Sequence, residues 1–190
     1  MSATNRGGQR KESDFYETPV AVIRDLLQNN HLEGDYKCIL EPCCGSGNMV
    51  LALRETYKDA VIMASDLRDI RQIPYASVTY GNSDFLTEPN LSSPVDLVFT
   101  NPPYTVAEKI IRRSFQLYPD AVVVMLLRLD FQGSQDRYEF WRNYPVNELY
   151  PLACRPSFTG GGTDSNNYGW FVWRPGVTTQ KVKVIWGRLE

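Results

Sequence analysis

The sequence is poor in the residues that build metal sites and disulfide frameworks. It contains one histidine, His31, and four cysteines among 190 residues, and no two cysteines form a CxxC pair. A zinc site or a disulfide scaffold therefore has little support. We expect no bound metal, and we expect reduced, packed thiols at Cys38, Cys43, Cys44 and Cys154.

Long hydrophobic runs are also missing. The longest wholly apolar run covers residues 121–127, which is far too short to span a bilayer. The N-terminus has no apolar segment of the signal-peptide type. These absences predict a cytoplasmic protein that does not contact membranes.

A large excess of charge of one sign is absent as well, since the formal net charge is −2. This value disfavours a protein that coats nucleic acid through its overall charge, although local basic clusters still count. Residues 1–13 are polar, contain Arg6, Arg10 and Lys11, and predict a flexible N-terminal arm. Such an arm either contacts phosphates when nucleic acid is bound or remains a solvated tail.

Apolar strands alternate with amphipathic helices along the rest of the chain. The expected strands are 38–41, 60–65, 78–80, 95–100, 121–127, 148–154 and 169–173, with an alternating edge strand at 182–186. The expected helices are 19–30, 48–57, 105–117 and 134–143, the first capped by Thr18 with Pro19 in its first turn. This order predicts an α/β fold with a doubly wound, mostly parallel sheet in a single domain, residues 14–190. The run at 121–127 is expected to be the central fifth strand.

The most informative segment is the strand 96–100, which stops abruptly at Asn101-Pro102-Pro103-Tyr104. Two successive prolines remove backbone donors and restrict φ, so both helix and sheet end there. The Asn101 side-chain oxygen and the Pro102 carbonyl can both accept hydrogen bonds from one NH2 group, and Tyr104 offers a flat stacking face. This corner is therefore suited to a planar amine.

A glycine turn follows the strand 38–41. Gly45 and Gly47 allow a tight turn and close approach of a ligand, and Asp66 comes 19 residues after Gly47, an offset that suits a carboxylate on ribose hydroxyls. A dinucleotide fold would carry a third glycine where Val50 stands. The pattern favours S-adenosylmethionine, which has a ribose and no phosphate, over NAD.

Three blocks together, 14–19, 39–48 and 101–104, resemble the class I S-adenosylmethionine-dependent amino-methyltransferases, and most closely the DNA adenine-N6 methyltransferases with the gamma order of motifs. The resemblance implies a Rossmann-like, seven-stranded sheet with helices on both faces. It also implies direct transfer of a methyl group to a flipped or single-stranded adenine. The ending at 166–173 is similar to that of small phage-type DNA methyltransferases.

The resemblance also implies a role for each matching position. Asp84 would accept the adenine amine of the cofactor, Phe85 and Leu67 would lie against its ring, and Glu41 would lie near the methionine end. The full set of implied cofactor-binding residues is Tyr16, Thr18, Pro19, Glu41, Pro42, Gly45, Gly47, Asp66, Leu67, Asp84, Phe85 and Asn101.

The acceptor side is expected to use Asn101, Pro102, Pro103 and Tyr104 for catalysis. Positioning and hydrogen bonds to the amine carry such a reaction, so neither a catalytic histidine nor a cysteine nucleophile is required. Phe158 resembles the aromatic residue that covers the other face of the base, with ordinary core packing as the alternative. Arg128 and Arg155 are candidate DNA contacts, with solvated surface charge as the alternative.

Only 86 residues follow Tyr104, and the sheet uses most of them, so we expect no separate target-recognition domain. Recognition would then come from loops at 129–137 and 155–168 or from a partner chain. Two other classes of function stay open: methylation of an RNA base amine or a protein glutamine amide at the same corner, and a non-catalytic binding module. The oligomeric state is not predicted.

Overall fold

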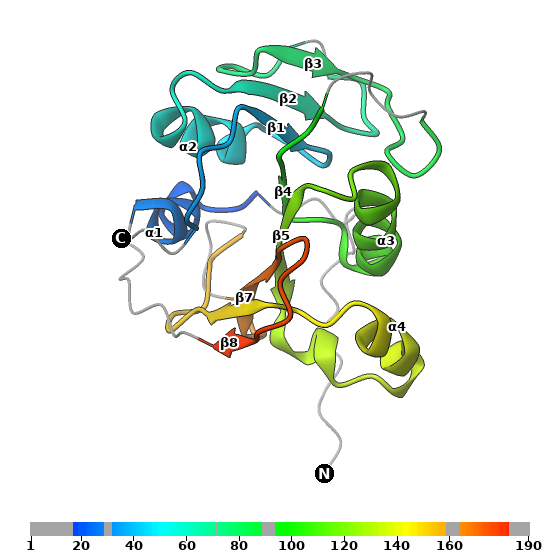
Figure 1. Cartoon of the computed structure of the whole chain (residues 1–190). Coiled ribbons are helices and arrows are strands. Elements are labelled where there is room, and N and C mark those ends of the chain that lie inside the picture. The colour runs from blue at the N-terminus through cyan, green and yellow to red at the C-terminus, as the bar shows by residue number, and fades with distance from the viewer. Residues whose placement is uncertain (1–16, 29–31, 71, 89–93, 159–163, 183–190) are drawn as a thin grey trace.

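The computed structural model describes residues 17–28, 32–70, 72–88, 94–158 and 164–182. Within them the chain forms one eight-stranded sheet in the order β3-β2-β1-β4-β5-β7-β6-β8, with helices on both faces (Figure 1). The strands are β1 (Cys38–Glu41), β2 (Val61–Ser65), β3 (Val78–Tyr80), β4 (Leu97–Thr100), β5 (Val122–Arg128), β6 (Glu148–Pro151), β7 (Tyr168–Trp173) and β8 (Lys181–Val182). The helices are α1 (Val20–Gln28), α2 (Asn48–Thr56), α3 (Ala107–Leu117) and α4 (Tyr138–Asn143), with the 3₁₀ turns η1 (Tyr104–Val106), η2 (Leu129–Gln132) and η3 (Gln135–Arg137). None of the helices in these ranges is long and apolar enough to cross a lipid bilayer.

The first five strands form a parallel half of the sheet. β1 pairs in parallel with β2 and β4, β2 with β3, and β4 with β5. β7 is antiparallel to both β5 and β6, and β6 is parallel to β8. The chain moves outward from β1 to β3 and then returns to β4 on the other side of β1, so the strand order reverses between β1 and β4. Open α/β sheets bind ligands beyond the carboxyl ends of strands at such a reversal.

Two hydrophobic clusters, one on each face of the sheet, hold the helices in place. Every residue of β1 and β4 is buried because helices cover both faces, and this explains why each strand is apolar up to its last residue, Glu41 or Thr100. α1 and α2 cover one face, where Ile23 packs in the same cluster as Ile39. α3 and α4 cover the other face, where Ile110 and Phe140 pack in the same cluster as Leu40 (Figure 1).

The predicted α/β class, the parallel core and the central position of β5 are confirmed, and the differences lie at the ends of elements. The sheet has eight strands, one more than the resemblance implies, because the expected edge strand is present as β8: the Lys181 amide donates to the Asn147 carbonyl (2.7 Å), and β8 pairs with β6. The expected strand 148–154 ends at Pro151, and only the Leu152 amide continues the pairing, by donating to the Tyr168 carbonyl (2.9 Å). The rest of the expected edge strand 182–186, and residues 29–30 of the expected first helix, lie outside the described residues.

The expected helix 134–143 is also divided. Its first turn is η3, closed by a hydrogen bond from the Arg137 amide to the Ser134 carbonyl (3.1 Å), and α4 follows directly. A bond across three residues is the mark of a 3₁₀ turn, which tightens the chain before α4.

Candidate active site

Three segments that are far apart in the sequence meet at Thr18. Its hydroxyl accepts a hydrogen bond from Asn101 Nδ2 at 3.0 Å, and its carbonyl accepts one from Asn48 Nδ2 at 3.0 Å. Asn101 follows β4, and Asn48 is the first residue of α2 after the glycine turn. The buried Thr18 therefore joins the N-terminal block, the glycine turn and the Asn-Pro-Pro-Tyr corner at the reversal between β1 and β4.

This contact also changes the expected role of Thr18. α1 begins at Val20, and the Val22 amide donates to the Pro19 carbonyl (3.0 Å). Thr18 therefore lies two residues before the helix instead of at its N-cap. Its hydroxyl accepts the hydrogen bond from Asn101, 83 residues away in the sequence. Because Asn101 Nδ2 donates to Thr18, the amide is oriented with Oδ1 as its remaining acceptor.

The glycine turn has the tight geometry that its sequence indicates. Gly47 has φ +92°, and a Cβ at this position would lie 2.5 Å from Ile73 Cγ2. Gly45 has φ +55°, and its amide donates to Asp66 Oδ2 at 2.9 Å. Positive φ angles and the approach of Ile73 explain why glycine is required here.

Asp66 lies at the end of β2 and is buried, and it is already engaged by a neighbour that the sequence analysis did not identify. Arg68 donates from Nε to Oδ1 (2.8 Å) and from Nη2 to Oδ2 (3.1 Å). Burial alone would raise the pKa of Asp66, but the hydrogen bonds from Arg68 and from the Gly45 amide outweigh it and lower the pKa. Asp66 is therefore an ionised acceptor at neutral pH.

Glu41, at the end of β1, is fully buried and has the opposite electrostatic character. Its Oε1 accepts a hydrogen bond from the Cys43 amide (3.0 Å), whereas Oε2 has no partner among the described residues. Burial raises the pKa of Glu41 to about 8, and the nearby Thr100 hydroxyl and Cys43 amide oppose this only in part. The Thr100 hydroxyl is itself buried and does not reach hydrogen-bond geometry with any described residue.

The two cysteines of the turn are not arranged as nucleophiles. Burial is the largest cause that raises the pKa of both the Cys43 and the Cys44 thiols, and the nearby Glu41 acts in the same direction. A reactive cysteine needs a lowered pKa. In the described ranges, no group of three or more His, Cys, Asp and Glu side chains lies close enough to hold a metal ion.

The residues expected at the adenine of the cofactor follow β2 and β3. The Ser83 amide donates to the Asp66 carbonyl (3.0 Å), which holds the segment with Asp84 and Phe85 next to Asp66. Asp84 Oδ1 accepts from the Leu86 amide (2.9 Å), and Phe85 is buried. Leu67, in contrast, is 67 % exposed, which is unusual for a leucine and leaves its side chain available to a ligand.

The acceptor corner is more crowded than expected. The Tyr104 hydroxyl donates to Asp130 Oδ1 (3.0 Å), and the Arg128 guanidinium lies over the Tyr104 ring, 4.5 Å from its centroid. Pro102 is buried, and Pro103 has extended backbone (φ −53°, ψ 126°) that directs the chain into η1. The corner therefore includes Asp130, which sequence reasoning missed.

Other expected site residues are packed in the core or paired with a neighbouring side chain. Phe158 is 9 % exposed and packs edge-on against Tyr168 with ring centroids 4.9 Å apart, so core packing accounts for most of its surface. The exposed Arg155 donates to Asn167 Oδ1 (3.1 Å). Pro42 is buried beside Glu41. The predicted arm 1–13, Tyr16 and part of the loop 155–168 lie outside the described residues.

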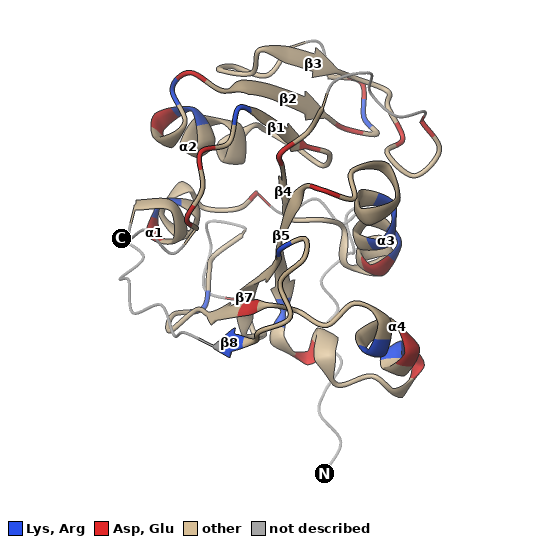
Figure 2. Cartoon of the chain, in the orientation of Figure 1, with Lys and Arg blue, Asp and Glu red and all other residues tan. Residues whose placement is uncertain are grey.

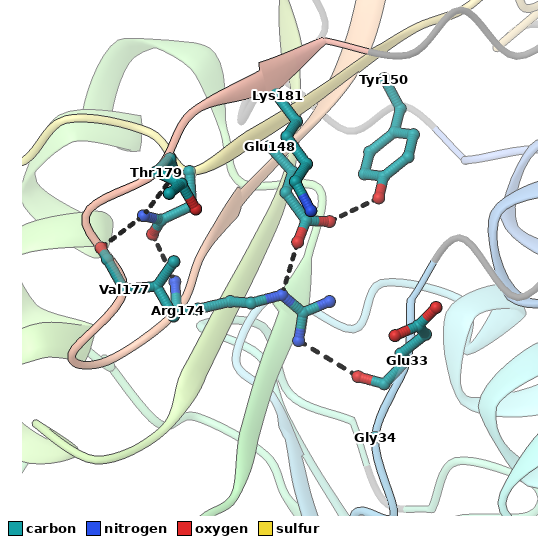
Figure 3. Close-up of a pocket in the computed structure, with 9 residues that line it drawn as sticks. Glu33, Gly34, Glu148, Tyr150, Arg174, Val177, Thr179 and Lys181 are labelled. Atoms are coloured by element: carbon teal, nitrogen blue, oxygen red, sulfur yellow. Dashed lines mark hydrogen bonds and ion pairs between the residues drawn. The ribbon is translucent and has the colours of Figure 1, made fainter.

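A cavity of about 430 Å³ lies away from this site, at the other edge of the sheet (Figure 3). Its lining includes Glu33 before β1, Asn147 before β6 and Arg174 after β7, together with residues of β6 and β8, so it lies at the amino ends of the parallel strands. Arg174 pairs with Glu148 (2.7 Å) and donates to the Glu33 carbonyl (3.1 Å). These groups satisfy one another, and the cavity contains none of the motifs.

Comparison with known proteins supports the architecture. No family model matches the chain. A type I restriction-modification methyltransferase subunit from Streptococcus thermophilus superimposes with TM-score 0.66 and 13 % identity, over 92 % of this chain and 48 % of that chain. An S-adenosylmethionine-dependent O-methyltransferase from Thermotoga maritima superimposes with TM-score 0.55 and 13 % identity, over 90 % of this chain and 70 % of that chain. The chain has the class I methyltransferase fold.

Two further matches show that the chain corresponds to only part of some similar proteins. The 23S rRNA methyltransferase ErmE superimposes with TM-score 0.58 and 16 % identity, over 83 % of this chain and 67 % of that chain. In sequence, 77 residues are 30 % identical to an uncharacterized MG259 homolog of Mycoplasma pneumoniae, covering 36 % of this chain and 17 % of that protein. The chain thus spans about half the length of the Streptococcus subunit and a sixth of the Mycoplasma protein.

Proposed function

We propose that this chain binds S-adenosylmethionine and catalyses methylation of an exocyclic base amine, with N6 of adenine in DNA as the acceptor. One observation carries the proposal: the Asn101 amide is tied through Thr18 to the glycine turn. An amine-binding corner and a nucleoside-binding turn therefore occupy the same reversal of the sheet, which is where such folds bind ligands.

The residues of the turn fit the proposed cofactor. Asp66 is an ionised acceptor suited to ribose hydroxyls, and Leu67 exposes an apolar side chain beside it. Glu41 has a buried oxygen that no described residue pairs with, which suits the ammonium of the methionine portion. When bound, S-adenosylmethionine supplies a methyl group on a positively charged sulfur, which is a good leaving group.

At the acceptor corner the protein acts by positioning. Asn101 Oδ1 and the Pro102 carbonyl would accept the two hydrogens of the amine and localise its lone pair on nitrogen. Tyr104 would stack on the base and offset part of the cost of removing it from a duplex. The raised pKa of the Cys43 and Cys44 thiols supports a mechanism without a covalent nucleophile.

The choice of adenine in DNA rests on the block 14–19, which resembles the DNA enzymes, and on likeness to a restriction-modification methyltransferase subunit. The Streptococcus subunit is about twice as long, so a partner chain or additional segments would supply target recognition. An RNA base amine is the second candidate, favoured by a likeness to ErmE that covers more of that protein. A protein glutamine amide is the third acceptor that the same corner fits.

The decisive experiment incubates the protein with methyl-labelled S-adenosylmethionine and separate pools of mixed-sequence DNA, RNA and protein. Mass spectrometry of the digested acceptors then identifies the modified atom. We expect N6-methyladenine in DNA, at short or relaxed target sites. Label in RNA or in glutamine would redirect the proposal to the second or third acceptor, and no label in any pool would reject it.

A further inference from the structure

Tyr104 is held at its hydroxyl by a residue that no motif includes. The phenol donates to Asp130 Oδ1 at 3.0 Å, and Asp130 lies in η2, directly after β5. Burial and this hydrogen bond both raise the pKa of Tyr104, so the phenol stays protonated and remains a donor. The ring is thereby fixed at the end that points away from the backbone.

The turn that carries Asp130 is firmly anchored. Its neighbour Phe131 is fully buried, and the Phe131 ring packs edge-on against Phe140 and Trp141, with centroids 6.1 and 5.7 Å away. Arg137 donates to the Phe131 carbonyl (3.2 Å) and lies over the Phe131 ring, 4.2 Å from its centroid. Asp130 itself is exposed, yet its backbone position is set by these buried contacts.

Arg128 covers one face of the same phenol. Its guanidinium lies 4.5 Å from the Tyr104 centroid, and its Nε makes a long contact of 3.4 Å with the Tyr168 hydroxyl. The Tyr168 hydroxyl in turn contacts Asp164 Oδ2 at 3.3 Å. With a cation stacked on one face, only the opposite face of Tyr104 remains for a base.

We propose that Asp130 and Arg128 are positioning residues that hold Tyr104 as a wall of the acceptor site. Asp130 fixes the hydroxyl, and Arg128 fills the face that the base does not use. This inference rests on the proposed function and deepens it, because it assigns Arg128 to the ring rather than to a DNA phosphate. A fixed ring orients the acceptor for attack more often than a mobile one does.

The first test is a double-mutant cycle with Asp130→Ala and Tyr104→Phe, measured as methyl transfer to a mixed-sequence DNA duplex. Each single variant should lower kcat by roughly tenfold with an unchanged KM for S-adenosylmethionine, and the double variant should be no worse than either single one. Asp130→Asn keeps the acceptor oxygen and should restore most of the rate. Additive losses, or an unchanged rate for Asp130→Ala, would overturn the role of Asp130.

The second test separates a ring contact from a phosphate contact at Arg128. Arg128→Gln should lower kcat while the dependence of DNA affinity on salt keeps its slope. A slope that falls by about one unit would assign Arg128 to a phosphate and overturn its role as a positioning residue. Turnover by the unmodified protein is measured first: its absence rejects the proposed function and this inference together, whereas normal turnover in the variants rejects this inference alone.

Discussion

Two glutamates lie at opposite ends of the parallel strands, Glu41 at the carboxyl ends and Glu148 at the amino ends, and they differ in their hydrogen-bond partners and pKa. Glu41, at the carboxyl ends of the strands, is fully buried, and one of its oxygens has no hydrogen-bond partner within the described residues; burial raises its pKa to about 8. Glu148, at the amino edge, is also largely buried, but its oxygens pair with Arg174 (2.7 Å) and with the Tyr150 hydroxyl (Figure 3). Burial would raise the pKa of Glu148, and these partners lower it instead.

The comparison indicates which polar cluster is built for a ligand. A buried polar group without a hydrogen-bond partner costs free energy in the unliganded protein. Such a group therefore indicates a site where a ligand supplies the missing partner. The amino ends of the strands have a cavity of about 430 Å³, but its polar groups form a hydrogen-bonded network that joins the ends of β6 and β7 to the segment before β8. Basic and acidic residues are interspersed on α3 and α4, so this face of the sheet has no surface of a single charge sign (Figure 2).

The largest expected effect concerns Asn101. Asn101→Ala removes the acceptor of the amine and should lower methyl transfer by about 10³-fold, while the affinity for S-adenosylmethionine stays within about threefold. Transfer is followed with labelled cofactor, and affinity by calorimetry. Asn147→Ala makes the same change at the amino edge and should leave kcat per folded molecule unchanged; an active Asn101→Ala variant would refute the assigned role.

The second effect is a change in the pH dependence of stability. The folded pKa of Glu41, about 8, lies above its ordinary value of 4.5, so its contribution to stability is complete below about pH 4.5 and is lost as pH rises to about 8. Glu41→Gln should therefore gain stability over the unmodified protein at pH 8.5, by an amount on the order of 4 kcal/mol.

The measurement is urea unfolding of the unliganded protein at pH 5.5, 7.0 and 8.5. Glu148→Gln is the matched control with the opposite sign. The folded pKa of Glu148 is lowered, so its stabilising contribution is present above the unfolded pKa and is lost on acidification. Parallel stability curves for Glu41→Gln and the unmodified protein would contradict the assignment of an uncharged Glu41.

The third effect concerns Asn147, at the amino ends of the strands, and the free energy of unfolding. Asn147 accepts from the Arg174 amide (2.7 Å) and donates to the Val177 carbonyl (2.7 Å), so Asn147→Ala leaves two partly buried hydrogen bonds unmade. We expect a loss of about 3 kcal/mol in the free energy of unfolding. Asn143→Ala, at an exposed residue of α4, is the control and should change stability little. Equal losses of stability in the two variants would show that the hydrogen bonds of Asn147 do not stabilise the fold in particular.

The smallest effect concerns the Thr100 hydroxyl, which makes no hydrogen bond to the part of the chain that the structure describes. Thr100→Val keeps the shape of the side chain and removes a buried polar group, so the unliganded protein should gain about 1 kcal/mol. Ser114→Ala is the contrasting control, because the buried Ser114 hydroxyl is paired with the Ile110 carbonyl (2.9 Å) and its removal should not stabilise. A destabilised Thr100→Val would show that this hydroxyl has a partner.

Much of the fold could be predicted from the sequence, because the patterns that indicate it lie within short segments of the chain. The continuous apolar strands β1, β4 and β5 predicted a parallel core covered on both faces, and Gly47 predicted the tight turn before α2. The ends of the elements were harder to predict, because pairing with a neighbouring strand decides where each one begins and stops. The edge strand expected at 182–186, for example, begins one residue earlier, at Lys181, where β8 pairs with β6.

The candidate site divides in the same way. The sequence by itself determined the chemistry available at the carboxyl edge, because the Asn-Pro-Pro-Tyr corner and the glycine turn are contiguous motifs. Only the tertiary structure decided how those groups are held: Thr18 on Asn101, Arg68 on Asp66, and Asp130 and Arg128 on Tyr104. The physical reason is that most of these contacts join side chains brought together from separate strands and turns, and their geometry depends on packing that no local pattern encodes.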